Sequence, residues 1–338
     1  MNIHLPSNYH ERGATFDDID TVADLANTYS QHYLSINESS PEEFRKEWQS
    51  SGFDPSTDTR LVFTPDGDLI GYAEVWATNE IPVYPWVWLR VHPDYIDTSI
   101  GPYLLGWAEE HARKVFDKVP ADARVAIRCG TADTIQDMIR LLKSINMTKI
   151  RHYLRMLIEM DELPQEPVWP AGINLRKYNP ETDAEAVYRT DAEAFKDHFG
   201  YVEETFEVGF PRFMHFLTED DTYDPTLWFL AMDKERVVGI CLGSKYTLED
   251  PECGYIKVLA VRRGWRRRGI ALALLQHSFR EYFRRGKRKV MLGVDGKNLT
   301  GALRLYENAG MRVLRRFDLY EKELRPGKEL STVGLAEQ

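Results

Sequence analysis

The chain has 338 residues, of which 43% are apolar and 28% are charged, and its formal net charge is −10. At about 150 residues per domain this length predicts two domains, and the composition is that of a folded protein rather than a disordered one. The negative charge argues against a general nucleic-acid binder, because such proteins normally carry a basic domain.

The first half of the chain alternates helical and strand patterns. Some segments repeat apolar residues every three or four positions, which predicts a helix. Others alternate apolar and polar residues, or are continuously apolar, between turn residues, which predicts a strand. The expected elements are a helix at 20–33, a hairpin at 59–78, a strand at 87–91, a helix at 100–116, a strand at 123–129, a helix at 134–146 and a strand at 147–160.

A proline-rich segment then divides the chain. Pro164, Pro167 and Pro170 disfavour both a helix and a central strand. We therefore expect one domain at 1–162, a linker at 163–171 and a second domain at 172–338. The second half is predicted as a strand at 173–178, a helix within 179–195, a hairpin at 228–244, a strand at 255–261, a helix at 270–285, a strand at 289–294, a helix at 298–310 and a strand at 311–324.

The two halves correspond to each other. The segment VHPDYIDTSIGPYLL (91–105) aligns without gaps with VRRGWRRRGIALALL (261–275), and LLKSINM (141–147) aligns with LYENAGM (305–311). Self-similarity on the scale of a domain indicates two copies of one fold.

The junction between the strand at 255–261 and the helix at 270–285 carries the clearest chemical signal. The first turn of a helix presents unpartnered backbone N–H groups and the positive end of its dipole, so it attracts anions. Gly269 allows a ligand to approach the backbone closely. Arg266, Arg267 and Arg268 add guanidinium groups that suit a phosphate or a pyrophosphate. Taken alone, the stretch could also be an arginine-rich solvated turn.

Two motifs resemble the Gcn5-related N-acetyltransferase (GNAT) superfamily. Arg266, Gly269 and Ala271 fit its Q/R-x-x-G-x-G/A acetyl-CoA-binding motif, which here follows a strand ending in Leu-Ala-Val. Residues 298–311, which contain Tyr306, look like its second motif, an A-x-x-L-Y-x-x-x-G-F/M segment preceded by an asparagine. The resemblance implies an α/β fold with two tandem GNAT-like domains. Each would have a mixed, mostly antiparallel sheet flanked by helices.

The resemblance also implies a role for each motif residue. The strand before the turn would pair with the pantetheine arm of acetyl-CoA, and the turn would hold the pyrophosphate. Tyr306 would protonate the departing thiolate. An aromatic residue on an amphipathic helix is more often part of the core, but its place inside the second motif favours the catalytic role. Asn298 is either a contact to pantetheine or a helix cap. The implied cofactor-binding residues are Leu259, Ala260, Val261, Arg266, Arg267, Arg268, Gly269, Ile270, Ala271 and Asn298.

The general base is the point at which the chain departs from the superfamily pattern. Many members carry Glu on the strand before the turn, and this chain has Tyr255 there. Glu252 in the preceding turn is the candidate carboxylate, and a solvated surface side chain is the alternative explanation. Water together with Tyr255 could also serve.

The first copy has lost the features of the turn. Asp97 and Thr98 correspond to Arg267 and Arg268, and Leu142 corresponds to Tyr306. An acidic turn repels a pyrophosphate, and leucine donates no proton. We therefore expect the N-terminal domain to bind acetyl-CoA poorly or not at all and to have a structural role.

The sequence thus predicts an N-acetyltransferase with acetyl-CoA as cosubstrate, no metal, and a small-molecule amine or a peptide as acceptor. The alternative is an acyl-CoA sensor without turnover. No nucleic-acid or membrane partner is expected, because the arginine runs flank one helix of an acidic chain and no apolar run approaches about 20 residues. The N-terminus lacks the apolar segment of a signal peptide, and the odd cysteine count (Cys129, Cys241, Cys253) favours free thiols in a cytoplasmic protein.

Overall fold

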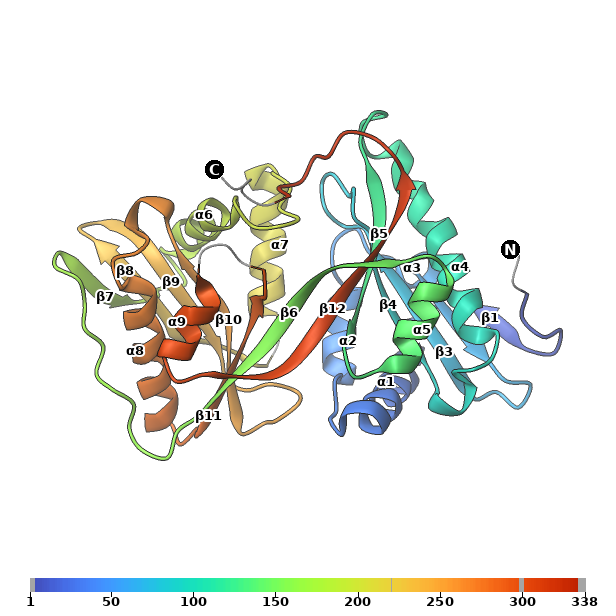
Figure 1. The fold of residues 1–338 in the computed structure, drawn as a ribbon, viewed down its shortest axis with the longest axis horizontal. Coiled ribbons are helices and arrows are strands. Elements are labelled where there is room, and N and C mark those ends of the chain that lie inside the picture. Colours follow the sequence, from blue (N-terminus) through green and yellow to red (C-terminus); the bar gives the residue numbers. More distant parts are fainter. Residues whose placement is uncertain (1–3, 220, 298–300, 334–338) are drawn as a thin grey trace. The chain divides into compact units, whose positions relative to one another are not determined.

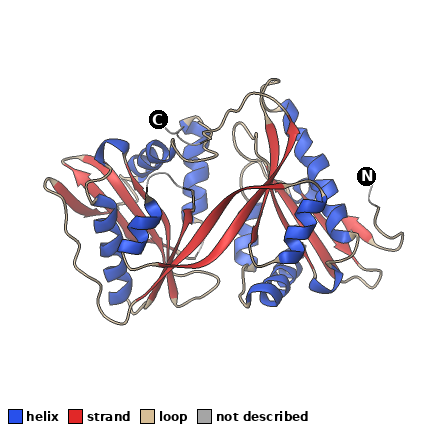
Figure 2. Ribbon diagram, viewed as in Figure 1, coloured by secondary structure: helices blue, strands red, loops and turns tan. Residues whose placement is uncertain are grey.

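The structure is a computed structural model that describes residues 4–219, 221–297 and 301–333. The chain forms two compact units (Figures 1 and 2). The first unit runs to His152 and also includes Phe317–Leu330. The second consists of Tyr153–Arg316 and the residues that follow Leu330. Both units combine a mixed sheet with helices, which confirms the predicted α/β class.

The sheet of the first unit has the strand order β1-β2-β3-β4-β5-β12. Neighbouring strands are antiparallel, except that β4 and β5 are parallel. The strands are β1 (His10–Arg12), β2 (Thr59–Phe63), β3 (Leu69–Trp76), β4 (Trp86–Val91), β5 (Val125–Ala132) and β12 (Arg312–Arg325). The helices are α1 (Ile19–Leu34), α2 (Pro41–Trp48), α3 (Pro55–Asp58), α4 (Ile100–Ala112) and α5 (Gln136–Ser144).

The sheet of the second unit has the order β7-β8-β9-β10-β11-β6, and again a single pair, β10 with β11, is parallel. Its strands are β6 (Thr148–Glu159), β7 (Ile173–Lys177), β8 (Tyr223–Asp233), β9 (Arg236–Ser244), β10 (Cys253–Val261) and β11 (Lys289–Asp295). Its helices are α6 (Ala184–Phe195), α7 (Phe206–Thr218), α8 (Ile270–Arg284) and α9 (Ala302–Asn308).

Each face of the second sheet carries its own hydrophobic core. On one face, α6 and α7 pack over alternate side chains of β10, including Val258 and Ala260. On the other face, α8 and α9 pack over Leu259 and Val261. Because successive side chains of a strand point to opposite faces, β10 contributes to both cores along its second half.

The predicted duplication is present in the structure. The short 3₁₀ turn Pro93–Tyr95 precedes α4 just as Arg263–Trp265 precedes α8. Ile100 and Ile270, the first residues of the two helices, are 170 residues apart. Two copies of one supersecondary arrangement therefore share the same junction.

The last strand of each repeat has residues in both compact units. In β6, the part from Tyr153 to Glu159 pairs with β11 of the second unit. In β12, the part from Phe317 to Arg325 pairs with β5 of the first unit. Each sheet is thus completed by a strand of the other repeat, and the proline-rich segment follows β6 without regular structure.

Two further observations bear on the sequence analysis. None of the helices in the described ranges is long and apolar enough to cross a membrane. Cys129, Cys241 and Cys253 are buried free thiols, and burial raises the pKa of each to about 12.

Candidate functional site

Strand β10 loses one of its neighbours halfway along its length. Residues Cys253 to Ile256 pair with β11. Beyond a register irregularity between Ile256 and Val258, β10 pairs with β9 up to Val261, and in the part of the chain that the structure describes no ladder joins this stretch to β11. An exposed row of backbone N–H and C=O groups is a template for an extended ligand that carries amides.

The turn after β10 concentrates free backbone N–H groups. Arg267 and Gly269 both have positive φ, 59° and 89°. Backbone of this kind, with left-handed residues interspersed, folds successive N–H groups into an anion-binding concavity. From Arg267 to Leu272 these N–H groups donate to no acceptor among the described residues. A Cβ placed on Gly269 would meet no atom within 4 Å, so the space in front of the turn is open.

Two arginines of the turn are available to an anion. The side chains of Arg267 and Arg268 are exposed. Within the described ranges neither forms an ion pair or a hydrogen bond. Together with the free N–H groups and the helix N-terminus, they make a site with positive potential, suited to a diphosphate rather than to a neutral ligand.

Arg266 has a different environment from its two neighbours. Its guanidinium donates to the carbonyl oxygen of Ala194 (2.6 Å), to that of Val261 (3.2 Å) and to Asp197 (3.1 Å). Arg263 also pairs with Asp197. Burial opposes ionisation of Asp197, but the hydrogen bonds from Arg263 and Arg266 lower its pKa. Arg266 therefore connects the turn to the end of α6 by hydrogen bonds and stabilises its position.

Asp197 was not found from the sequence. It lies 69 residues before Arg266, and no local pattern marks a partner at that separation. The fold alone brings the end of α6 to the end of β10.

Tyr306 lies in α9, with 7% of its surface exposed, in the core that contains Leu259 and Val261. Its hydroxyl has no hydrogen-bond partner among the described residues. Burial, together with the neighbouring Cys241 and Tyr255, raises the pKa of Tyr306. The phenol therefore stays protonated at neutral pH and can act only as a proton donor in its resting state.

Some of the remaining predicted site residues lie at the junction of β10 and α8, and others do not. Ala260 lies on the open stretch of β10, and Ile270 and Ala271 begin α8. Asn298 lies outside the described residues. Glu252 precedes β10 at its other end, six residues before Val258, which at a rise of about 3.3 Å per residue is about 20 Å away. Its side chain is 83% exposed and faces Lys287, so its position argues against a role as the base.

In the first unit, hydrogen bonds within the corresponding turn occupy part of its backbone. Thr98 Oγ1 accepts from the Ile100 N–H (3.3 Å) and donates to the carbonyl oxygen of Tyr95 (2.6 Å). Asp97 is exposed, with Arg140 at 3.7 Å. Leu142, the counterpart of Tyr306, is fully buried. The first unit thus keeps the shape of the junction, but the N–H groups of Thr98 and Ile100 are already hydrogen-bonded and the arginines of the second turn are absent.

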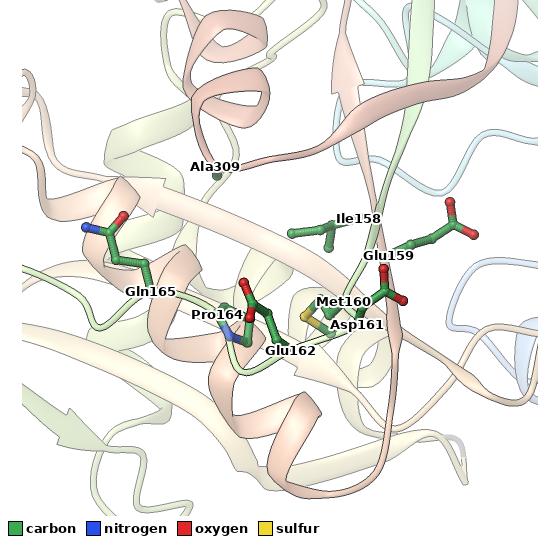
Figure 3. A pocket seen from close by; sticks show the side chains of 8 residues that line it. All are labelled: Ile158, Glu159, Met160, Asp161, Glu162, Pro164, Gln165 and Ala309. Carbon is green, nitrogen blue, oxygen red and sulfur yellow. The ribbon is translucent and has the colours of Figure 1, made fainter.

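A hollow of about 610 Å³ lies elsewhere in the second unit (Figure 3). It is lined by Ile158, Glu159, Met160, Asp161, Glu162, Pro164, Gln165 and Ala309. Three of these side chains are carboxylates and none is basic, so the hollow does not suit a phosphate. None of the predicted site residues lines it.

An open strand edge that leads into a positively charged helix N-terminus, with Tyr306 in the adjoining core, fits a binding site for an acyl-CoA donor. The profile of the Acetyltransferase (GNAT) family matches residues 188–311. A GCN5-related N-acetyltransferase from Sphaerobacter thermophilus has a structure that covers 97% of this chain and 100% of its own, with 35% identity and a TM-score of 0.80. The chain belongs to the GCN5-related N-acetyltransferase family and is an acetyl-CoA-dependent acyltransferase.

Two further relatives concern the tandem architecture. A mycothiol acetyltransferase of Streptomyces scabiei is 26% identical over 267 residues, which is 78% of each chain. A tandem GNAT protein from the clavulanic acid biosynthesis pathway covers 95% of this chain and 100% of its own, with 16% identity and a TM-score of 0.70. This likeness confirms the tandem fold that the duplication predicts.

Proposed function

We propose that the second unit transfers the acetyl group of acetyl-CoA to a primary amine of a small molecule, by direct attack in a ternary complex. The proposal rests on one observation: the open edge of β10, the turn with free N–H groups and Tyr306 adjoin one another. The open edge of β10 ends at the turn with free N–H groups, and Tyr306 packs in the same core as Leu259 and Val261 of that edge.

Each feature then has one task. The backbone of β10 from Val258 to Val261 binds the amide groups of the pantetheine arm as an added strand. The N–H groups of the turn, with Arg267 and Arg268, bind the pyrophosphate. Arg266 holds the turn in place through Asp197.

Tyr306 acts on the leaving group. A thiolate expelled into a buried site is stabilised when a positioned acid protonates it, and general acid catalysis of this kind contributes about 10²- to 10⁴-fold. The side chain of Tyr306 is largely buried and protonated, and its hydroxyl has no partner among the described residues. These properties suit an acid that meets its partner when the substrate binds.

The first unit takes no part in acetyl-CoA binding. Its turn is acidic, and Thr98 occupies the Ile100 N–H group. We assign residues 1–162 to this degenerate copy, 163–171 to the linker and 172–338 to the catalytic copy, with the terminal strands exchanged as described above.

The acceptor is a small molecule that carries an amine. The mycothiol acetyltransferase name of several relatives points to a small-molecule acceptor rather than to a peptide. A net charge of −10 favours the approach of a cation. Small primary amines, polyamines and aminoglycosides therefore belong in the first screen, together with amines related to mycothiol.

A sensor that binds acyl-CoA without turnover is the second candidate, favoured by Tyr255 at a position where many superfamily members carry Glu. The test is thiol release from acetyl-CoA across this amine panel. Turnover with one amine supports the proposal. Tight CoA binding without release of thiol for any amine would favour the sensor.

A further inference from the structure

Asp191 of α6 differs from the other shielded carboxylates of the second unit. Its side chain is only partly exposed, and within the described ranges it has no hydrogen bond and no ion pair. By contrast, Asp183 pairs with Arg176 at 2.7 Å, and Glu249 pairs with Arg315 at 3.0 Å. A shielded carboxylate without a partner is destabilising and is retained chiefly where it has a function.

The helical period places Asp191 on one flank of α6. Thr190 donates to the carbonyl oxygen of Val237 near the start of β9 (3.4 Å), and Glu193 binds Arg262, which follows the end of β10. The side of α6 that carries Thr190 and Glu193 therefore faces that end of the sheet. At 100° per residue, Asp191 falls on the opposite flank, as does Tyr188.

That flank faces α7 and the open stretch of β10. Tyr188 packs edge-on against Phe206, Phe210 and Phe213 of α7. Phe213 belongs to the same apolar core as Val258. Asp191 therefore lies on the flank of α6 that faces α7, on the side of the sheet that carries Val258 and opposite the side on which Tyr306 packs.

The duplication provides an internal control. In each copy a helix follows an aspartate that pairs with an arginine of the preceding strand, Asp18 with Arg12 and Asp183 with Arg176. When these aspartates are aligned, Asp191 corresponds to Ala26, which is fully buried. The copy that lacks the phosphate-binding turn thus has alanine at this position, and the fold itself does not need a carboxylate there.

We propose that Asp191 binds the ammonium group of the acceptor and accepts the proton that the nitrogen must lose before it attacks the thioester. The inference rests on the function proposed above. Asp191 takes one proton from the ammonium and passes it to solvent. The amine then forms the C–N bond as the C–S bond breaks. The second N–H proton, lost as the amide forms, replaces the proton that Tyr306 gives to the sulfur.

The electrostatic surroundings support this role. Burial raises the pKa of Asp191 to about 7. The titratable and charged groups on the elements packed around it are Glu185, Tyr188, Arg189 and Glu193 on α6, Glu207, Arg212 and His215 on α7, and Cys253, Tyr255 and Lys257 on β10. Of these, Tyr188 interacts electrostatically with Asp191. A carboxyl group that titrates near neutral pH is well matched to exchange a proton with an amine.

The test compares Asp191→Asn with the wild-type enzyme, using the amine found in the screen. We expect kcat/KM to fall by about 10²- to 10⁴-fold and the acidic limb of its pH profile near pH 7 to disappear. Asp191→Glu should restore part of the activity. Glu185→Gln is the matched control, because Glu185 lies on the exposed side of the same helix, paired with Arg189, and should leave both quantities unchanged.

Calorimetric titration with CoA separates this inference from the function on which it rests. Asp191→Asn should bind CoA as the wild type does. Activity of Asp191→Asn within about threefold of wild type with the same acidic limb, or a parallel loss of CoA binding, would overturn the assignment. A wild-type enzyme that turns over no amine would instead overturn the proposed function, and this inference with it.

Discussion

Replacing Asp191 with Asn should stabilise the fold at alkaline pH. The pKa of Asp191 is raised from its ordinary 3.8 to about 7 by burial, so between these two values the folded state binds more protons than the unfolded state. The free energy of unfolding of the wild type therefore falls as the pH rises through this window, and the loss is complete above pH 7. Asparagine does not titrate, so the Asp191→Asn variant does not lose this part of the free energy of unfolding.

The magnitude follows from the shift. About three pKa units at about 1.4 kcal/mol each set an upper limit of about 4 kcal/mol. Because the side chain keeps some contact with solvent, we expect a gain of about 2 to 4 kcal/mol for Asp191→Asn at about pH 8.5 and little difference at about pH 4.

Chemical denaturation of both proteins at these two pH values measures the difference directly. Glu185→Gln, at an exposed position of α6, controls for the general effect of removing a negative charge from an acidic chain. A difference between wild type and Asp191→Asn that does not change with pH would refute the picture of a shielded, unpaired carboxylate.

Three further variants test the acetyl-CoA site. Tyr306→Phe should lower kcat by about 10²- to 10⁴-fold without changing the Kd for CoA, and equal thiol-release rates for the two proteins would rule out the acid. Gly269→Ala should lower the free energy of unfolding by about 1 to 2 kcal/mol, because φ is 89° there, and should weaken CoA binding; unchanged values of both in denaturation and calorimetry would contradict the geometry of the turn. Asp197→Asn should weaken CoA binding by about tenfold, which is about 1.4 kcal/mol, because Arg263 and Arg266 lose the carboxylate that fixes the turn, and an unchanged Kd would show that the turn needs no such support.

The sequence predicted the elements whose signals are local. The hairpins, the buried strand β10 and the amphipathic helix α8 each follow from periodicity and turn residues, and Gly310 ends α9 with φ of 90°, as a residue after a helix should. The junction between β10 and α8 was predictable because the chain contains it twice.

Three helices, α2, α7 and the single-turn α3, escaped the sequence analysis. Pro211 lies inside α7, and an internal proline normally argues against a helix. The start of α2 does carry a signal, since Ser40 caps it by accepting from the Glu43 N–H (3.2 Å) and Pro41 follows at the first helical position. This cap could have been recognised.

Other features depend on contacts that are distant in sequence. The exchange of the terminal strands is decided by pairing between segments such as Phe317–Arg325 and β5, and a strand pattern does not specify its neighbour. The roles of Asp191 and Asp197 also depend on the packing of α6 against β10. A single Asp in a helical pattern is otherwise indistinguishable from a solvated one.

Calorimetric titration with CoA tests the central claim that the second unit alone holds the acyl donor. The double variant Arg267→Asp, Arg268→Thr gives the second turn the residues Asp97 and Thr98 of the first. We predict one site per chain for the wild type and no measurable binding for the double variant. Two sites in the wild type, or full binding by the double variant, would contradict the account.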